Sequence, residues 1–318
     1  MSSTDASDES SGGNDGVVRV ICGPTGAGKS ALAMRLAESH DALIISADSR
    51  QIYRGFDIGT AKPSAGDRAT VPHCGIDVAD PVERYSAARW AAEARGWIRE
   101  ARASGREPLV VGGTGFYLRA LVEPLFESPD LDPVRRAALE RVFPSIPTET
   151  LRRWCTNLDP DRAHLGRTQL IRSIETAMLT GSRLSDLHRT HARAPEIRAR
   201  YLVVDPGSRL GGRIERRADA MLADGWADEV AALSRSVDHD APAWKASGYG
   251  VIRDMVEGRV SKAHARDRVI IETRQYAKRQ RTWFRHQLND AETTRVDPDD
   301  HSIEATMNHW WAGRRTNP

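Results

Sequence analysis

The chain has 318 residues, 40% of them hydrophobic, and its 46 lysines and arginines nearly balance 44 aspartates and glutamates. This composition supports a full hydrophobic core and excludes a chain that is disordered throughout. No apolar run approaches the roughly 18 to 20 residues of a membrane-spanning helix, and the three cysteines include no CxxC pair, so the sequence supports neither a disulfide framework nor a structural zinc site. Because the N-terminus also lacks a signal-peptide pattern, we expect a cytoplasmic protein with no membrane partner.

The order of apolar runs along the chain indicates an α/β fold. Residues 1–16 are rich in Ser, Gly and Asp and almost free of apolar residues, so we expect a disordered tail there. Apolar runs typical of buried strands follow at 17–23, 42–48, 108–113 and 201–205, with helical patterns between them. This alternation predicts a parallel sheet flanked by helices.

The domain organisation follows from a change of pattern in the middle of the chain. Residues 123–195 are Arg-rich and of helical type without a strand-like run, which predicts a helical insertion domain. Residues 17–122 and 196–288 would then form the catalytic core, whose last part consists of helices. We expect residues 289–318 to be a polar C-terminal tail.

A phosphate-binding loop follows the first predicted strand and precedes a helix. Its sequence, GPTGAGKS, matches the pattern GxxxxGK[ST], in which glycines let backbone N–H groups point at a phosphate and the lysine adds a positive charge. The hydroxyl of the last residue can ligate Mg²⁺. The same pattern is the ATP-binding motif of P-loop proteins, so it predicts a phosphorylated ligand without identifying it. The binding residues are Gly23, Pro24, Thr25, Gly26, Ala27, Gly28, Lys29 and Ser30.

Two further polar residues close predicted strands, where an open α/β sheet builds its active site. Asp48 follows the second strand and has three interpretations, which are an acid that holds Mg²⁺, a general base, or the cap of a following helix. Thr114 stands between two glycines after the third strand, where it either donates its hydroxyl to a phosphate oxygen or caps a helix.

Positive charge gathers near the C-terminus, in residues 261–287. On a helix, one stripe suited to phosphates is formed by Arg274, Lys278, Arg281 and Arg285. A neighbouring stripe that offers stacking surfaces and amides to bases is formed by Tyr276, Gln280, Trp283 and Gln287. The alternatives are a solvated helix face for the cations and core packing for Trp283.

These stretches together resemble the tRNA dimethylallyltransferases, which prenylate the adenosine immediately 3′ of the anticodon. The resemblance spans residues 17 to 288 and rests on GPTGAGKS, SADSRQIYRGFDIGTAKP, VPHCGIDVADP, PLVVGGTGFYLRAL and TRQYAKRQRTWF. It implies a P-loop NTPase-like core with a helical insertion domain, dimethylallyl diphosphate as donor and Mg²⁺ as cofactor. The reaction that it implies is prenyl transfer to adenine N6 in tRNAs that read codons beginning with U.

The resemblance also implies roles for single residues. Asp48 would be the general base at adenine N6, and Thr114 would contact the bridging oxygen of the diphosphate. Arg213 and Arg217, four residues apart on one helix face, could reach the diphosphate, the alternative being two exposed arginines. The residues expected to face the tRNA anticodon stem-loop are Ser49, Arg50, Gln51, Arg135, Thr168, Gln169, Leu170, Ile171, Arg172, Arg274, Lys278, Arg281, Trp283 and Arg285.

Three other functions compete with this interpretation. A P-loop small-molecule kinase would share the loop and the strand-end aspartate but gives no reason for the segment TRQYAKRQRTWF. An adenylate isopentenyltransferase would share the donor site but lacks the segments GTAKP and TRQYAKRQ. A non-catalytic RNA-binding protein could use the loop as a nucleotide switch, although Asp48 and Thr114 beside the loop argue against it. For the tRNA enzyme we expect a monomer.

Overall fold

The structure is a computed structural model that describes residues 16–123, 131–190 and 197–313. The chain divides into a larger unit, formed by residues 1–122 and 196–318, and a smaller unit, residues 123–195. The predicted disordered tail lies outside the described residues except for Gly16. Within the described ranges, every helix is too short or too polar to cross a membrane.

The larger unit is built on a six-stranded parallel sheet with strand order β3-β2-β4-β1-β5-β6. This confirms the predicted α/β fold with a P-loop NTPase-like core. Because all strands are parallel, the residues that follow β1, β2 and β4 meet at one edge of the sheet. The strands are β1 (Val17–Cys22), β2 (Ala42–Ser46), β3 (His73–Cys74), β4 (Glu107–Gly112), β5 (Arg198–Val204) and β6 (Thr293–Val296).

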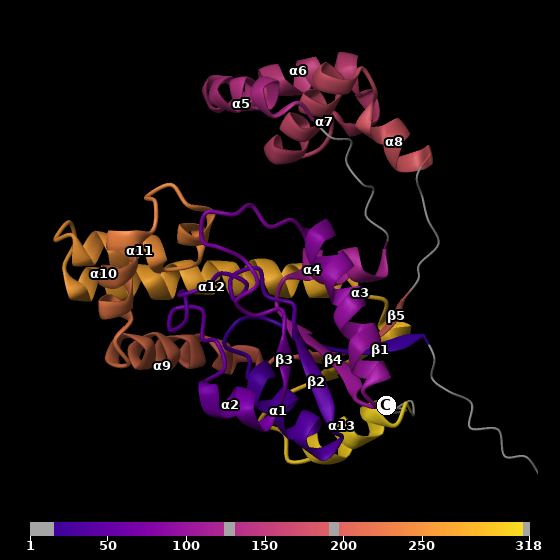
Figure 1. Ribbon diagram of the computed structural model, residues 1–318, viewed down its shortest axis with the longest axis vertical. Coiled ribbons are helices and arrows are strands. Elements are labelled where there is room, and N and C mark those ends of the chain that lie inside the picture. Colours follow the sequence, from indigo (N-terminus) through magenta and orange to yellow (C-terminus); the bar gives the residue numbers. More distant parts are fainter. Residues whose placement is uncertain (1–15, 124–130, 191–196, 314–318) are drawn as a thin grey trace, which may run out of the picture. The chain divides into compact units, whose positions relative to one another are not determined.

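The helices of the larger unit surround this sheet and extend beyond one of its edges (Figure 1). The longest, α12, begins after the N-cap Ser261 and runs beside α4, α9 and α11. The helices are α1 (Lys29–Ser39), α2 (Ala65–Thr70), α3 (Ala87–Ala103), α4 (Gly115–Val122), α9 (Leu210–Ala223), α10 (Trp226–Ser236), α11 (Tyr249–Val256), α12 (Lys262–Gln287) and α13 (Ile303–Trp311).

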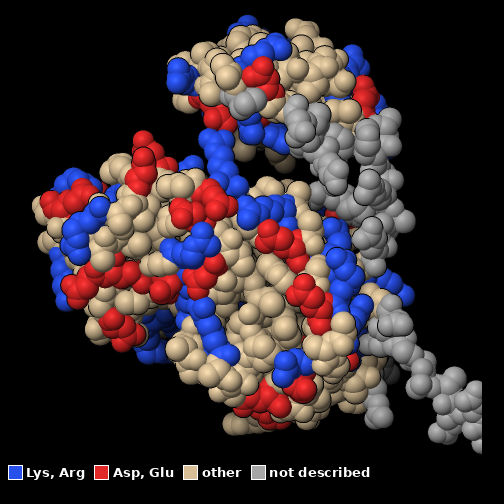
Figure 2. All heavy atoms as spheres, viewed as in Figure 1, with Lys and Arg blue, Asp and Glu red and all other residues tan. Residues whose placement is uncertain are grey.

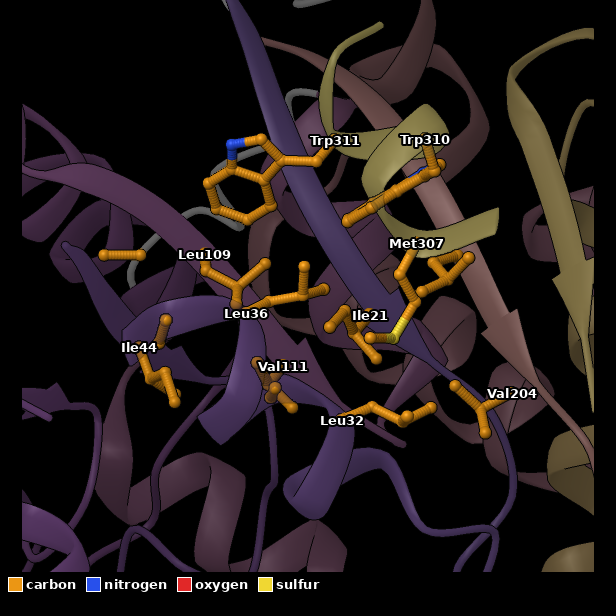
Figure 3. Close-up of a cluster of buried hydrophobic side chains, with 14 of the residues drawn as sticks. Ile21, Leu32, Leu36, Ile44, Leu109, Val111, Val204, Met307, Trp310 and Trp311 are labelled. Carbon is orange, nitrogen blue, oxygen red and sulfur yellow. The ribbon is translucent and has the colours of Figure 1, made fainter. Parts of the chain in front are cut away.

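One face of the sheet is covered by α1 and α13. Leu32 and Leu36 of α1 pack with strand residues such as Ile21, and Met307 and Trp310 of α13 join the same cluster (Figure 3). These side chains are almost completely buried. Burial of this apolar area fixes α1, and with it the loop that precedes α1, on the central strands.

The helix α3 packs against β2 and β4 from the other side. The indole of Trp90 donates a hydrogen bond to the Ser46 carbonyl at the end of β2 (2.9 Å) and stacks on Tyr117 of α4, with ring centroids 4.8 Å apart. Trp90 thereby anchors the end of β2 and the start of α4, the two positions from which Asp48 and Thr114 project.

The C-terminal segment departs from the prediction. Residues 289–318 were predicted as a polar tail, yet β6 extends the sheet beside β5, and α13 packs into the core. The guanidinium of Arg19 donates two hydrogen bonds to the Trp311 carbonyl, at 3.0 and 2.9 Å. The prediction was wrong because the net polarity of the segment hides Ile303, Met307 and Trp310, whose helical spacing builds an apolar face.

The smaller unit is entirely helical in its described residues. Its helices are α5 (Pro133–Val142), α6 (Thr148–Leu158), α7 (Arg167–Thr180) and α8 (Leu184–Thr190). They enclose a core of their own, formed by Phe143, Leu151, Cys155, Leu170 and Ile174. Because these residues have a hydrophobic core of their own, the insertion meets the main requirement for folding as a separate unit.

Candidate active site

The loop after β1 has the geometry of a phosphate-binding loop. Gly26 and Gly28 have φ values of 78° and 97°, which residues with side chains rarely adopt. Gly28 is the N-cap of α1, so the positive end of that helix opens into the loop. The Lys29 ammonium donates a hydrogen bond to the Pro24 carbonyl (2.8 Å) and thereby folds back over the loop.

Two half-buried cations, Lys29 and Arg217, lie beside this loop. Burial lowers the pKa of the Lys29 ammonium to about 8, and the nearby carboxylate of Asp48 only partly offsets the effect. Burial likewise lowers the pKa of Arg217, whose guanidinium donates a hydrogen bond to the Thr25 hydroxyl (3.1 Å). Such desolvated cations gain most from an incoming anion, because little water screens the attraction.

Asp48 and Thr114 lie at the carboxyl ends of β2 and β4. The Asp48 carboxylate accepts a hydrogen bond from the Arg50 N–H (2.9 Å), and turns rather than a helix follow, so the helix-cap interpretation was wrong. The Thr114 hydroxyl accepts a hydrogen bond from the Ser49 N–H (3.0 Å). Thr114 thus ties the loop that carries Asp48 to the turn before α4.

A cavity of about 390 Å³ begins at the phosphate loop. Lys29, Ser30 and Arg217 line it together with Asp48, and apolar side chains line it as well. The apolar lining includes Ala33, Met34, Ile44, Ile76 and Val111. One cavity therefore combines a phosphate-binding wall with an apolar wall, which suits an amphiphilic phosphorylated ligand.

A second, smaller cavity of about 60 Å³ shares Thr25, Asp48, Thr60 and Arg217 with the first. Tyr276 of α12 and Trp226 of α10 also line it. Burial raises the pKa of the Tyr276 phenol to about 12, so this side chain stays a neutral hydrogen-bonding group. Asp48 consequently borders two cavities at once.

Arg213 and Arg217 differ in position. Arg217 lines both cavities, whereas Arg213 forms an ion pair with Asp299 beside Gly28, outside the lining of either. Asp299 lies between β6 and α13, in the segment predicted as a tail, so a carboxylate at this place could not be expected from the sequence pattern. Of the two arginines predicted to reach the diphosphate, only Arg217 therefore lines these cavities, and its contact with a diphosphate stays a prediction.

The cations predicted on α12 have different surroundings. Arg281 donates hydrogen bonds to the Asp205 carboxylate and the Gly207 carbonyl, and Arg274 pairs with Glu215. Figure 2 likewise shows Lys and Arg interspersed with Asp and Glu on its visible face. Among the described residues, Lys278 and Arg285 are exposed with no recorded ion pair. Two of the four cations predicted to bind phosphates, Arg274 and Arg281, are thus already paired with carboxylates.

The neighbouring stripe on α12 faces inward at Gln280 and Trp283. The Gln280 amide is buried and bonds to the phosphate loop and to the Gly113 carbonyl just after β4, so its predicted contact with a base was wrong. Trp283 is half-buried against Gly115, consistent with its core-packing interpretation.

The loop between β2 and α2 contains a site residue that sequence reasoning missed. The Lys62 side chain is only 2% exposed, and its ammonium binds the Tyr53 carbonyl, Asp57 (2.7 Å) and Asp77 (2.5 Å). Gln51, predicted to face tRNA, bonds instead to the Ser46 hydroxyl (2.8 Å) and the Ala61 carbonyl (3.0 Å). Both side chains hold the loop that forms one wall of the larger cavity.

For one residue of the smaller unit, the prediction that it faces tRNA was wrong. Leu170 is fully buried in that unit's core and has no surface to offer to RNA. Ile171 packs partly against the same core, and Arg172 pairs with Glu175 (3.5 Å). Arg135 and Thr168 are exposed, as is Gln169, whose amide oxygen accepts a hydrogen bond from the Gly166 N–H (3.2 Å).

Comparison with known proteins agrees with this geometry. Residues 51–287 match the family described as IPP transferase, and residues 16–70 match the one described as isopentenyl transferase. A tRNA dimethylallyltransferase of Halorhodospira halophila is 42% identical over 93% of this chain and 97% of its own length. One from Alkalilimnicola ehrlichii is 44% identical over 85% of this chain and 88% of its own.

A solved structure extends the likeness to the fold. The tRNA isopentenylpyrophosphate transferase of Bacillus halodurans superimposes with a TM-score of 0.66 and 32% sequence identity, covering 93% of this chain and 95% of its own. Taken with the sequence matches over most of the chain, this shows that the chain belongs to the IPP transferase family of prenyl-transferring enzymes.

Proposed function

We propose that this chain is a tRNA dimethylallyltransferase. It transfers the dimethylallyl group of dimethylallyl diphosphate to N6 of the adenosine 3′-adjacent to the anticodon, in tRNAs that read codons beginning with U. The products are N6-(dimethylallyl)adenosine and diphosphate. The observation that carries the proposal is the pair of cavities that meet at Thr25, Asp48 and Arg217, since a transfer needs two substrates on either side of one reacting centre.

The larger cavity suits the donor. Its diphosphate would lie on the loop, within reach of the Lys29 ammonium and the Arg217 guanidinium, and its prenyl group would lie against Met34, Ile44 and Val111. As the carbon–oxygen bond breaks, negative charge grows on the leaving diphosphate. Half-buried cations that are already in place stabilise that charge without reorganisation.

The smaller cavity suits the acceptor base. Adenine N6 attacks C1 of the donor, the C1–oxygen bond breaks, and its electron pair leaves with the diphosphate. Asp48 accepts the proton that N6 loses. An adenine stacked in an anticodon loop must leave the stack first, at a cost of a few kcal/mol, and the cavity has to widen around Trp226 and Tyr276 to receive it.

Mg²⁺ fits this site if the phosphates of the donor, and not a set of protein side chains, supply most of its ligands. The described residues contain no cluster of three His, Cys, Asp or Glu side chains that could hold a metal. Mg²⁺ is commonly bound by one or two protein oxygens and by substrate phosphates, with water completing its shell. The Ser30 hydroxyl, at the start of α1, would supply the protein ligand. When bound, the ion neutralises diphosphate charge.

The exposed cations of α12 suit the RNA backbone. Lys278 and Arg285 leave their charges in solvent, and Arg279 stacks over Tyr276 with its guanidinium 5.8 Å from the ring centroid. Contacts of this kind position RNA through its phosphates. Together with Arg50, which borders the smaller cavity, they would hold the anticodon stem-loop while its base is extruded.

One experiment tests the reaction and its rivals. The protein is mixed with Mg²⁺, labelled dimethylallyl diphosphate and either tRNA or AMP, and parallel samples receive ATP labelled at its γ-phosphate. We expect label from the donor in tRNA alone, independent of ATP. Label in AMP alone would indicate an adenylate isopentenyltransferase, and transfer only from ATP would indicate a kinase.

A further inference from the structure

A buried amide of α12 connects three segments that are distant in sequence. The Gln280 side chain is only 6% exposed. Its Oε1 accepts a hydrogen bond from the Thr25 N–H in the phosphate loop (2.8 Å), and its Nε2 donates one to the Gly113 carbonyl after β4 (2.8 Å). A buried amide with partners at both ends is held in one orientation, because rotation would leave polar groups unsatisfied.

The turn that carries Thr114 is shaped around this helix. A methyl group built on Gly113 would lie 2.3 Å from Gln280 Nε2, and one built on Gly115 would lie 2.3 Å from the Trp283 ring. Both distances are shorter than real contacts allow, so the two glycines let α12 rest directly on the turn. Thr114 therefore stands between two points at which α12 supports the backbone.

The contact with the phosphate loop has a second consequence. Because the Thr25 N–H bonds to Gln280, it is not directed at a phosphate, unlike the amides usual in such loops. Instead the residue is held so that its hydroxyl accepts the hydrogen bond of Arg217 (3.1 Å). Gln280, Thr25 and Arg217 form a chain of hydrogen bonds from α12 to α9, along the lining of the larger cavity.

We propose that Gln280 is a positioning residue for prenyl transfer, and that it acts through Thr25 on Arg217 and through Gly113 on Thr114. Both ends of its amide are already bonded to backbone groups, so it acts by holding those groups and not by bonding to a substrate. The proposal rests on the proposed function, because it takes Arg217 as a residue that binds the donor diphosphate and keeps the sequence prediction that Thr114 contacts the bridging oxygen. It also explains why an amide lies among the cations of α12: Ala277, Gln280 and Phe284 face inward, while Lys278, Arg279 and Arg285 are exposed.

The first test compares two variants of α12. Gln280→Met keeps the side-chain length and removes both hydrogen bonds, whereas the control Thr282→Val removes only an exposed bond to the helix's own Lys278 carbonyl (3.1 Å). For Gln280→Met we expect donor affinity without tRNA and the single-turnover transfer rate each to fall about tenfold or more. We expect unchanged tRNA affinity, and a Thr282→Val variant that matches wild type throughout.

A loss of tRNA affinity in parallel with donor affinity would indicate general damage to α12 and would overturn the proposal. So would a Gln280→Met variant that behaves like Thr282→Val. If wild-type protein transfers no label to tRNA, the proposed function itself fails, and that result is distinct from either of these.

A second test does not depend on the stability of Gln280→Met. Gly113→Ala places a methyl group against Gln280 Nε2, and Gln280→Ala removes that obstacle, leaving the Gly23 carbonyl at 3.3 Å as the next neighbour. We expect Gly113→Ala to slow transfer strongly in the wild-type background and only slightly in the Gln280→Ala background. Equal fold-changes in the two backgrounds would show that Gln280 does not support the Thr114 turn.

Discussion

The half-buried ammonium of Lys29 makes donor binding a proton-linked event. In the free protein, burial lowers its pKa to about 8. The charge of a bound diphosphate favours the ammonium form and raises this pKa again. The donor should therefore take up a proton as it binds, wherever the pH is high enough for the free protein to have lost one.

The magnitude follows from the position of the pKa. With a value of about 8, the free amine is deprotonated in roughly a tenth of molecules near pH 7, half near pH 8 and nine tenths near pH 9. The number of protons taken up per donor molecule bound should equal these fractions at the same pH values. The terminal phosphate of the donor does not interfere, because its last ionisation lies near pH 6. Above pH 8, donor affinity should fall by up to about tenfold per pH unit.

Isothermal titration calorimetry measures this uptake directly. Dimethylallyl diphosphate with Mg²⁺ is titrated into the protein without tRNA, in pairs of buffers that differ in ionisation enthalpy. The control is Lys29→Arg, because a guanidinium cannot lose its proton in this pH range. This variant should show no proton uptake, however tightly it binds the donor. An uptake near zero for wild type near pH 8 and pH 9 would refute the reasoning, because Lys29 would then be charged before the donor arrives.

Three further predictions concern other parts of the chain. Asp48→Asn keeps the acceptor for the Arg50 N–H but not the base, so single-turnover transfer should fall by about 100-fold or more with tRNA affinity retained; a wild-type rate would exclude Asp48 as the base. Lys278→Ala should lower the salt slope of tRNA binding by about 1, whereas Arg281→Ala, which leaves Asp205 unpaired, should instead lower the free energy of unfolding by about 1–2 kcal/mol. Equal salt slopes for these two variants would contradict that distinction. Met307→Ala should cost about 2–5 kcal/mol in denaturant-induced unfolding, and a negligible change would show that α13 adds nothing to the core.

The parts of the fold with a strong local signal were predictable from the sequence. The strand before GPTGAGKS, the loop and α1 obey a pattern in which almost every position has a physical reason. Asp48 and Thr114 could be found because parallel strands bring their carboxyl ends together. These inferences need only residues that are close in sequence or a rule about sheets.

Contacts between distant segments could not be predicted in this way. Helical spacing put Arg281 and Gln280 on the predicted RNA-binding surface, but it contains no information about Asp205 or the Thr25 N–H, which lie far away in the chain. Lys62 was missed for a different reason: Asp57 and Asp77 lie only 5 and 15 residues away, but no regular helix or strand spacing predicts that their carboxylates meet its ammonium. In each case the partner that neutralises a polar group decides its role.

The position of β6 and α13 also bears on the order in which the protein can assemble during synthesis. The sheet gains its edge strand β6 only after residues 293–296 have left the ribosome. The core around α1 is completed later still, when α13 packs into it. Until β6 is in place, β5 presents an unpaired edge, the kind of edge through which strands of separate chains associate. Residues 123–195, by contrast, have their core partners within one continuous stretch and are complete much earlier. A nascent chain stalled before residue 293 would therefore carry a finished helical unit and an unfinished larger unit.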